Sequence, residues 1–399
     1  MKQMTKRAFR PVIQRIYCMR AAAPRLAFID ALKAIASQLI VLHHLAFYGP
    51  MSDIANGLAP ALIAWLSQDA RIAVQVFLVI GGFLAAKGLA PDGRLTATHP
   101  LALLQSRYLK LAIPYLAALL LSIGCAAIAG QLMTHDSIPG APSTLQFIAH
   151  ALLLQNLLNF DSLSAGVWYI AIDFQLFTLL LSVLWLARSL GNRINGSRIL
   201  GVLLVAGLAI ASLFHFNRSS AWDDWALYFF GSYALGVLAY WASERKQAPG
   251  WLAIIAMAVI AALLMDYRSR IAVALLVALA LAIARRSGGM EKYPRGRILA
   301  YLGQISYSVF LLNFPIALVI NAVFSYLAPE NTLVNALGML IAWAACVGAG
   351  ALFYHAVECR ARQWQTLAKK LTLDPLLALG ERLAFIVRFV FRSRLRPKP

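Results

Sequence analysis

The sequence predicts an all-α protein that crosses a membrane about ten times, and three observations lead to this fold class. Hydrophobic residues make up 61% of the 399 residues and charged residues only 13%, which is far from the composition of soluble domains. Apolar runs of roughly 17 to 25 residues, long enough to cross a bilayer as helices, recur along the chain. The basic residues are concentrated in alternate connections between these runs, as expected of a polytopic membrane protein.

The apolar runs predict ten spanning helices in order along the chain. Their expected ranges are 28–49, 72–89, 109–130, 166–187, 199–216, 222–243, 250–266, 271–286, 299–323 and 333–355. Segments expected in the cytoplasm hold thirty of the 36 Lys and Arg residues, those expected outside hold four, and two lie within helices. Both termini are therefore predicted to be cytoplasmic, and topology rather than nucleic-acid binding explains the net charge of +20.

The segments outside the spans are short. Residues 1–27 are basic and lack the features of a cleavable signal peptide, so they are expected to form a cytoplasmic N-terminal segment. Residues 356–399 form a basic tail whose amphipathic helical spacing is typical of a helix on the anionic cytoplasmic leaflet. Two apolar stretches, 56–66 and 144–160, are expected to be interfacial or re-entrant helices on the outside.

The four cysteines show no spacing typical of a metal site, and the predicted topology scatters them between cytoplasm and membrane. They are Cys18, Cys125, Cys346 and Cys359. We therefore expect unpaired thiols and no metal centre.

Four ionisable side chains lie in the first expected span. Asp30 and Lys33 are near its inner end, and His44 lies fourteen residues, about 21 Å, beyond Asp30. Such groups are costly at membrane depth and usually functional. His44 shares their helical stripe and is expected to face the interior, whereas His43, about 100° away, is expected to be a lipid-interface or packing residue. A local Asp30–Lys33 pair that only neutralises itself is the alternative for those two residues.

Asp173, in the span expected over 166–187, lies roughly 10 Å from the outer end and so at a depth comparable to that of His44. A carboxylate beside an imidazole fixes its tautomer and raises its basicity, as in a general base that deprotonates a hydroxyl. The sequence therefore predicts an Asp173–His44 pair, with a purely structural pair as the alternative.

Arg107 and Lys110 lie one turn apart, just before the span expected to begin at 109. Two cations at this spacing form a compact patch that can bind phosphate. Positive-inside flanking of a helix is the alternative reason for such a pair.

Five motifs in order across nearly the whole chain resemble those of the acyltransferase-3 family of integral-membrane acyltransferases. They are R-x4-D-x-L-[RK]-x10-H over 25–44, FLVIGGF over 77–83, R-x2-[RK] followed by proline over 107–114, W-Y-x3-[ED]-x-Q over 168–175, and LGQISYSVFLLNFPI over 302–316. Any one of them alone would be a weak signal, but their order makes the resemblance specific.

The resemblance implies transfer of an acyl group, commonly acetyl, from cytoplasmic acyl-CoA to a hydroxyl of a cell-envelope or exported carbohydrate. Acyl-CoA, expected to be acetyl-CoA, is then a co-substrate, and no permanently bound cofactor is expected. Residues 28–355 would form the acyltransferase domain of an inner-membrane protein. Its expected partners are acyl-CoA, a carbohydrate or lipid-linked saccharide acceptor and membrane lipid, and not nucleic acid.

The same resemblance implies roles for residues by their positions in the motifs. The catalytic group is expected to comprise His44, which matches the family's catalytic histidine, with Asp173, Lys33 and Asp30. Donor binding is expected from Arg107, Lys110 and Arg25. Acceptor or substrate binding is expected from Trp168, Tyr169, Gln175 and Asn313.

The chain also departs from the family pattern. Gly81 stands in place of a serine, Asn313 in place of a histidine, and the motif beginning at Tyr354 lacks its proline. Asparagine can donate and accept hydrogen bonds but cannot shuttle a proton, so His44 is the expected base. A transporter or flippase of lipid-linked sugars is the alternative function, although it would more often show paired helices broken by Gly or Pro. A structural membrane subunit is a third reading, which five ordered polar motifs disfavour.

Overall fold

The computed structural model describes residues 25–191, 196–245, 247–248, 250–328 and 330–361. All regular secondary structure in these ranges is helical, which confirms the all-α class. Nearly all of the basic N-terminal segment, Cys18 and almost the whole predicted leaflet-bound tail lie outside the described residues. The other three cysteines form no disulfide.

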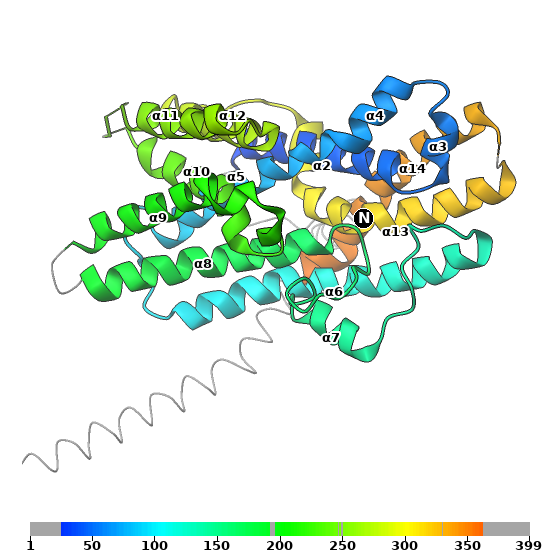
Figure 1. Ribbon diagram of the computed structural model, residues 1–399, viewed down its shortest axis with the longest axis horizontal. Coiled ribbons are helices and arrows are strands. Elements are labelled where there is room, and N and C mark those ends of the chain that lie inside the picture. The colour runs from blue at the N-terminus through cyan, green and yellow to red at the C-terminus, as the bar shows by residue number, and fades with distance from the viewer. Residues whose placement is uncertain (1–24, 192–195, 246, 249, 329, 362–399) are drawn as a thin grey trace, which may run out of the picture.

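Within the described ranges, ten long helices cover the ten predicted spans (Figure 1). They are α2 (Ala27–Phe47), α5 (Val74–Leu89), α6 (Pro100–Leu132), α8 (Val167–Gly191), α9 (Ser197–Phe214), α10 (Ala226–Ala242), α11 (Gly250–Met265), α12 (Ser269–Arg286), α13 (Arg297–Leu327) and α14 (Thr332–Phe353).

Seven of the described helices have the length and composition to cross a membrane. Two others, α10 and α11, are apolar but have only 17 and 16 residues. The eighteen residues of α12 include three arginines. The chain is thus a multi-pass membrane protein by its helices, while the crossing number of ten and the side of each terminus stay predictions.

Three short helices connect the long ones. Helices α3 (Pro50–Ala55) and α4 (Pro60–Gln68) each begin with a proline, which suits the first turn because its missing N–H needs no partner there. Helix α7 (Thr144–Ala151) begins with a capping box between Ser143 and Gln146. The predicted helix over 144–160 is thus half as long as expected, because turns with positive φ at Leu153 and Asn159 follow α7.

Helix α6 is longer than predicted and changes the place of its cations. It starts at Pro100 rather than near 109 and continues through Pro114 to give 33 residues, or about 50 Å. Arg107 and Lys110 therefore lie two to three turns inside a helix rather than just before it. Pro100 suits the first turn of this helix, and Leu103 and Leu104 are partly buried against the bundle, which favours a start before the span that hydropathy predicts.

Glycines bring the central helices into backbone contact. A Cβ at Gly82 of α5 would lie 1.9 Å from the carbonyl oxygen of Tyr233, and one at Gly236 of α10 would lie 1.9 Å from that of Val79. Similarly, a Cβ at Gly303 of α13 would lie 2.1 Å from the Asp30 carbonyl oxygen of α2. Small residues permit such close packing, which membrane helices use in place of the hydrophobic effect.

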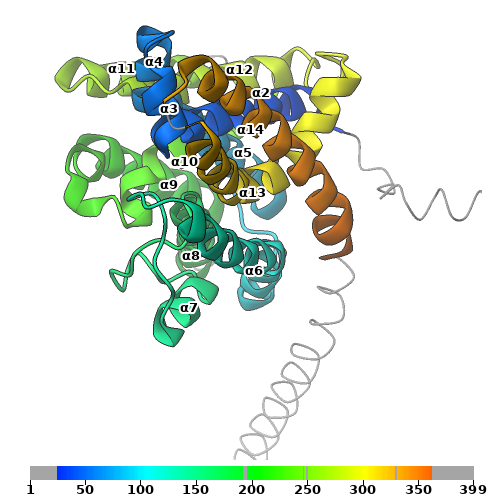
Figure 2. The same cartoon turned by 90° about the vertical axis from the view of Figure 1, so that its right-hand side faces the viewer.

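The two views agree on the arrangement of the bundle. Helices α6 and α8 lie along one edge, α11 and α12 lie along the opposite edge, and α2, α5 and α13 lie between them (Figures 1 and 2). Helix α13 contacts α2, α6 and α14, and α5 contacts α10. The residues singled out in the sequence are carried mainly by α2 and α13 of the central layer and by α6 and α8 at the neighbouring edge.

Candidate active site

A cavity of about 480 Å³ lies among α2, α5, α6, α8, α10 and α13. Its charged lining consists of Lys33 from α2, Arg107 and Lys110 from α6, and Asp173 from α8. Three cations and one anion thus converge on one space from three helices that are far apart in sequence. Such a site has the charge and the size to hold part of an anionic ligand.

Arg107 and Asp173 form a buried ion pair at the wall of this cavity. The Nη2 atom of Arg107 lies 2.5 Å from Oδ2 of Asp173, and the guanidinium also lies 5.3 Å from the centre of the Phe177 ring. The Nε atom of Arg107 is buried and has no hydrogen-bond partner among the described residues. Arginine offers five donors in a planar fork, so this pairing leaves donor capacity for a second anion.

This ion pair overturns one prediction. Asp173 was expected to pair with His44, but it forms an ion pair with Arg107, and His44 is hydrogen-bonded to Asn313. The physical reason is that Arg107 lies inside α6 and not at a helix mouth, so that it reaches the depth of Asp173. A buried carboxylate gains more from a guanidinium than from an imidazole that already has a partner.

His44 is buried and hydrogen-bonded through Nδ1 to Oδ1 of Asn313. The amide of Asn313 is oriented by its own helix, because Nδ2 donates to the carbonyl oxygens of Phe310 at 2.8 Å and Val309 at 3.3 Å. Its Oδ1 is then an acceptor, so the His44 Nδ1 must carry the proton. The Nε2 atom of His44 is left with its lone pair, which is the form a general base requires.

His43 lies on another face of α2, as predicted. Its Nδ1 atom is 3.0 Å from the carbonyl oxygen of Leu66 on α4, and the imidazole ring lies 5.5 Å from the ring of Phe47. This confirms the expectation of a packing residue. The two adjacent histidines therefore have different hydrogen-bond partners, although their ring centres lie 5.4 Å apart.

A comparison with protein families identifies the family of the chain. A family model for the acyltransferase-3 acyltransferase domain matches residues 26–355, which is most of the chain and contains all ten long helices. The chain belongs to the acyltransferase-3 family. Searches among curated proteins and among solved structures gave no match. Family membership makes the protein a membrane acyltransferase and leaves donor and acceptor to be argued from its own residues.

The other residues of the acyltransferase-3 motifs differ in whether they line the cavity. Lys33 lines the cavity, whereas Asp30 is not among the described residues that line it. Arg25 is exposed and hydrogen-bonded to Gln304 of α13. Gln304 in turn donates to the hydroxyl of Tyr354 at 2.5 Å. Arg25 thus joins α2 to the end of α14, and the structure does not bring it to the cavity wall.

The three aromatic and amide residues expected to bind substrate on α8 separate in the structure. Tyr169 lines the cavity. Trp168 packs 5.7 Å from the ring of Phe229 and is not among the residues that line it. The Oε1 of Gln175 accepts from the backbone N–H of Ala226 at 3.0 Å, which supplies one of the otherwise unpaired donors at the start of α10.

Gly81, where the acyltransferase-3 family usually has serine, also lines the cavity. A Cβ there would lie 3.6 Å from Oδ1 of Asp173 and 3.1 Å from Cε2 of Tyr233. The glycine therefore leaves room beside the carboxylate that a serine would fill.

Among the aromatic residues that line the cavity, sequence reasoning missed three from α10 and α13. Tyr233 of α10 is buried with no hydrogen-bond partner for its hydroxyl among the described residues, and Tyr307 of α13 donates to the carbonyl oxygen of Leu111 at 3.0 Å. Phe310 of α13 is the third. The last two lie within the motif over 302–316 and could have been singled out there, whereas Tyr233 lies in no recognised motif.

Proposed function

We propose that the protein is an O-acyltransferase of the inner membrane that moves an acyl group, most simply acetyl, from cytoplasmic acyl-CoA to a hydroxyl of a cell-envelope or exported carbohydrate. The observation that carries this proposal is the large cavity with its three cations. Coenzyme A carries several phosphates, and Lys and Arg are the side chains that bind them.

The proposed topology brings a cytoplasmic donor to this cavity. Ten crossings with both termini in the cytoplasm place the starts of α2, α6 and α13 and the end of α5 on the cytoplasmic side. Leu89 at the end of α5 and Leu103 near the start of α6 both line the cavity. The donor would thus enter between these two helices and extend toward the middle of the bundle.

The proposed reaction uses His44 as the base. The Nε2 atom takes the proton of the acceptor hydroxyl while its oxygen forms a bond to the acyl carbonyl carbon. The carbon–sulfur bond of the thioester then breaks, and the proton passes from His44 to the departing thiolate, so the products are an ester and free coenzyme A. Asn313 holds the imidazole in the tautomer that can accept this proton.

The alternative of a sugar flippase has less support. Both helices with an internal proline, α6 at Pro114 and α13 at Pro315, continue without interruption. Transporters of the repeat type place their substrate sites at discontinuous helices.

The test uses the full chain in lipid nanodiscs. We expect acetyl-CoA to release free thiol slowly without acceptor, and labelled acetyl to appear on carbohydrate when an envelope extract is added. Acetyl-pantetheine, which lacks the phosphates, should be a much poorer donor than acetyl-CoA. Lys110→Ala should reduce the difference in rate between these two donors. Movement of a lipid-linked sugar between leaflets without any thiol release would contradict the proposal.

A further inference from the structure

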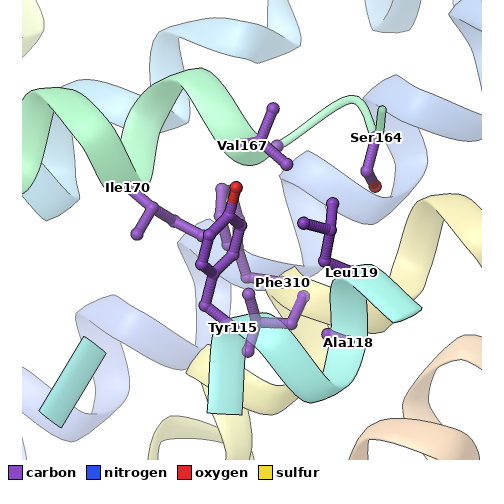
Figure 3. A pocket seen from close by; sticks show the side chains of 9 residues that line it. Tyr115, Ala118, Leu119, Ser164, Val167, Ile170 and Phe310 are labelled. Atoms are coloured by element: carbon purple, nitrogen blue, oxygen red, sulfur yellow. The ribbon is translucent and has the colours of Figure 1, made fainter. Parts of the chain in front are cut away.

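A second, much smaller cavity lies next to the large one. Its volume is about 10 Å³, close to that of a single water-sized probe. It is lined by α6, by the start of α8 with the residues just before it, and by α13. Figure 3 shows Tyr115, Leu119, Val167 and Phe310 around it, with Ile170 and Ser164 on opposite sides.

Both cavities lie along one face of α6. The α6 residues that line the large cavity are Leu103, Ser106, Arg107, Lys110 and Leu111, and those that line the small one are Tyr115, Ala118 and Leu119. Steps of three and four residues keep a helix on one face, and this series consists of such steps together with the adjacent pairs 106–107, 110–111 and 118–119. The small cavity therefore continues the large one along the helix axis.

Phe310 and Ile170 are the two residues that line both cavities. The ring of Phe310 lies 5.4 Å from that of Tyr169, and a Cβ on Gly166 would lie 2.9 Å from its Cζ atom. The ring is thus held between an aromatic neighbour and a glycine that leaves just enough room for it. Its side chain forms the partition between the two spaces.

The order of groups along the large cavity indicates which end of a donor meets Phe310. The Tyr307–Leu111 hydrogen bond fixes α13 beside α6 just beyond Lys110, and Phe310 lies almost one turn beyond Tyr307. From Leu103 onward the cavity therefore offers cations first and the Phe310 ring last. A donor with its phosphates near Lys110 would direct its acyl group at Phe310.

We infer that Phe310 closes the acyl end of the donor cavity and so limits the length of the acyl chain that is transferred, with the small cavity as the space that a longer chain would occupy. This inference rests on the proposed function. The carbonyl oxygen of Phe310, which holds Asn313 and through it His44, is retained in any substitution of the side chain.

The test compares butyryl-CoA with acetyl-CoA as donors for the wild type and for Phe310→Ala. We expect the kcat/KM ratio of butyryl-CoA to acetyl-CoA to rise roughly tenfold or more in the variant, because a pocket discriminates by about that factor for each methylene it must exclude. An unchanged ratio in a variant that still uses acetyl-CoA would overturn the inference. If the wild type itself released no thiol from acetyl-CoA, the proposed function would fail instead.

Filling the small cavity supplies the matched control. Ala118→Val adds bulk behind the Phe310 ring. As a single substitution it should leave the butyryl-CoA to acetyl-CoA ratio at the wild-type value. In the Phe310→Ala background it should reverse the rise in that ratio. A gain that persists in the double variant would show that the small cavity plays no part.

A second variant covers the case in which Phe310→Ala does not fold. Gly166→Ala should push the ring toward the large cavity and lower the same ratio below that of the wild type. A ratio that rises or stays constant in this variant would contradict the position of Phe310 at the acyl end.

Discussion

Two buried polar pairs, Arg107–Asp173 and His44–Asn313, differ in charge and in access. The first joins α6 to α8 with opposite formal charges at the wall of the large cavity, and the Arg107 side chain is 24% exposed. The second joins α2 to α13 through an imidazole and an amide, and Asn313 is fully buried. The first pair can therefore meet an incoming anion, while the second is fixed by backbone carbonyls.

This difference assigns separate parts of the reaction to the two pairs. Arg107 meets Asp173 through Nη2 and its side chain is 24% exposed, so other donors of the guanidinium can bind a phosphate without loss of the carboxylate partner. An imidazole held by an oriented amide has one tautomer and hence one basic nitrogen. Changes in the first pair should act on donor binding and stability, and changes in the second on turnover. Substitutions in each pair test this division.

The largest expected effect is that of His44→Ala. Loss of the general base should lower kcat by about 10² to 10⁴ with little change in the KM of acetyl-CoA, because His44 does not line the donor cavity. The measurement is the steady-state rate of ester formation in nanodiscs.

His43→Ala is the matched control for this prediction. Its ring bonds to the Leu66 carbonyl oxygen in a separate packing cluster, so most of the turnover should remain. Equal losses of kcat in the two variants would remove the distinction between the two histidines.

The next largest effect should come from breaking the charged pair. Arg107→Met leaves Asp173 as a buried carboxylate without its partner, which costs roughly 3–5 kcal/mol of folding free energy. The double variant Arg107→Met/Asp173→Asn removes both charges and should regain much of that stability in a thermal unfolding assay in detergent. It should nevertheless bind acetyl-CoA weakly, since the cation is still missing.

The single variant Asp173→Asn distinguishes pairing of this carboxylate with Arg107 from pairing with His44. Because Asp173 pairs with Arg107, the variant should change stability and donor KM while the kcat dependence on pH keeps its shape. A shifted pH profile of kcat would instead connect Asp173 to His44.

How much of this site could be read from the sequence depends on whether a residue's partner lies on its own helix. The helical stripe on α2 was enough to separate His44 from His43, and hydropathy located all ten long helices. The partner of Asp173 could not be predicted, because hydropathy put the start of α6 nine residues too late and so placed Arg107 at the wrong depth. Tyr233 was missed because its place depends on the close packing of α5 against α10, which no local pattern encodes.

A further prediction concerns the amide of the second pair. Asn313→Leu keeps the volume but leaves the buried Nδ1–H of His44 without an acceptor, which costs about 1–3 kcal/mol and should lower kcat roughly ten- to hundredfold. Asn313→His restores the residue usual in the family and can still present one N–H and one lone pair. It should retain more activity than Asn313→Leu, measured as kcat at saturating acetyl-CoA. Equal activity of the two variants would show that the tautomer of His44 does not depend on residue 313.

The smallest expected effect concerns His150, a buried imidazole that contrasts with His44 because both of its nitrogens are occupied. In the connection before α8, its Nδ1 donates to the carbonyl oxygen of Gln146 at 2.8 Å, and its Nε2 accepts from the backbone N–H of Leu163 at 3.2 Å. Burial lowers the pKa of His150 below its ordinary value of 6.5, although the hydrogen bond to Gln146 partly opposes this shift.

The pH dependence follows from the direction of that shift. A group whose pKa is lower in the folded state takes up its proton more readily in the unfolded state, so the connection should be fully stable above about pH 6.5 and lose stability as the pH falls below it, by at most about 1.4 kcal/mol per pH unit. Limited proteolysis of residues 131–165 at pH 7.5 and pH 5 would measure this loss. His150→Gln should abolish the difference between the two pH values, whereas His135→Gln should preserve it, because His135 bonds only to nearby Ser137. If the wild type were cut at the same rate at both pH values, protonation of His150 would have no part in holding this connection, and its bond to Leu163 would have to be dispensable.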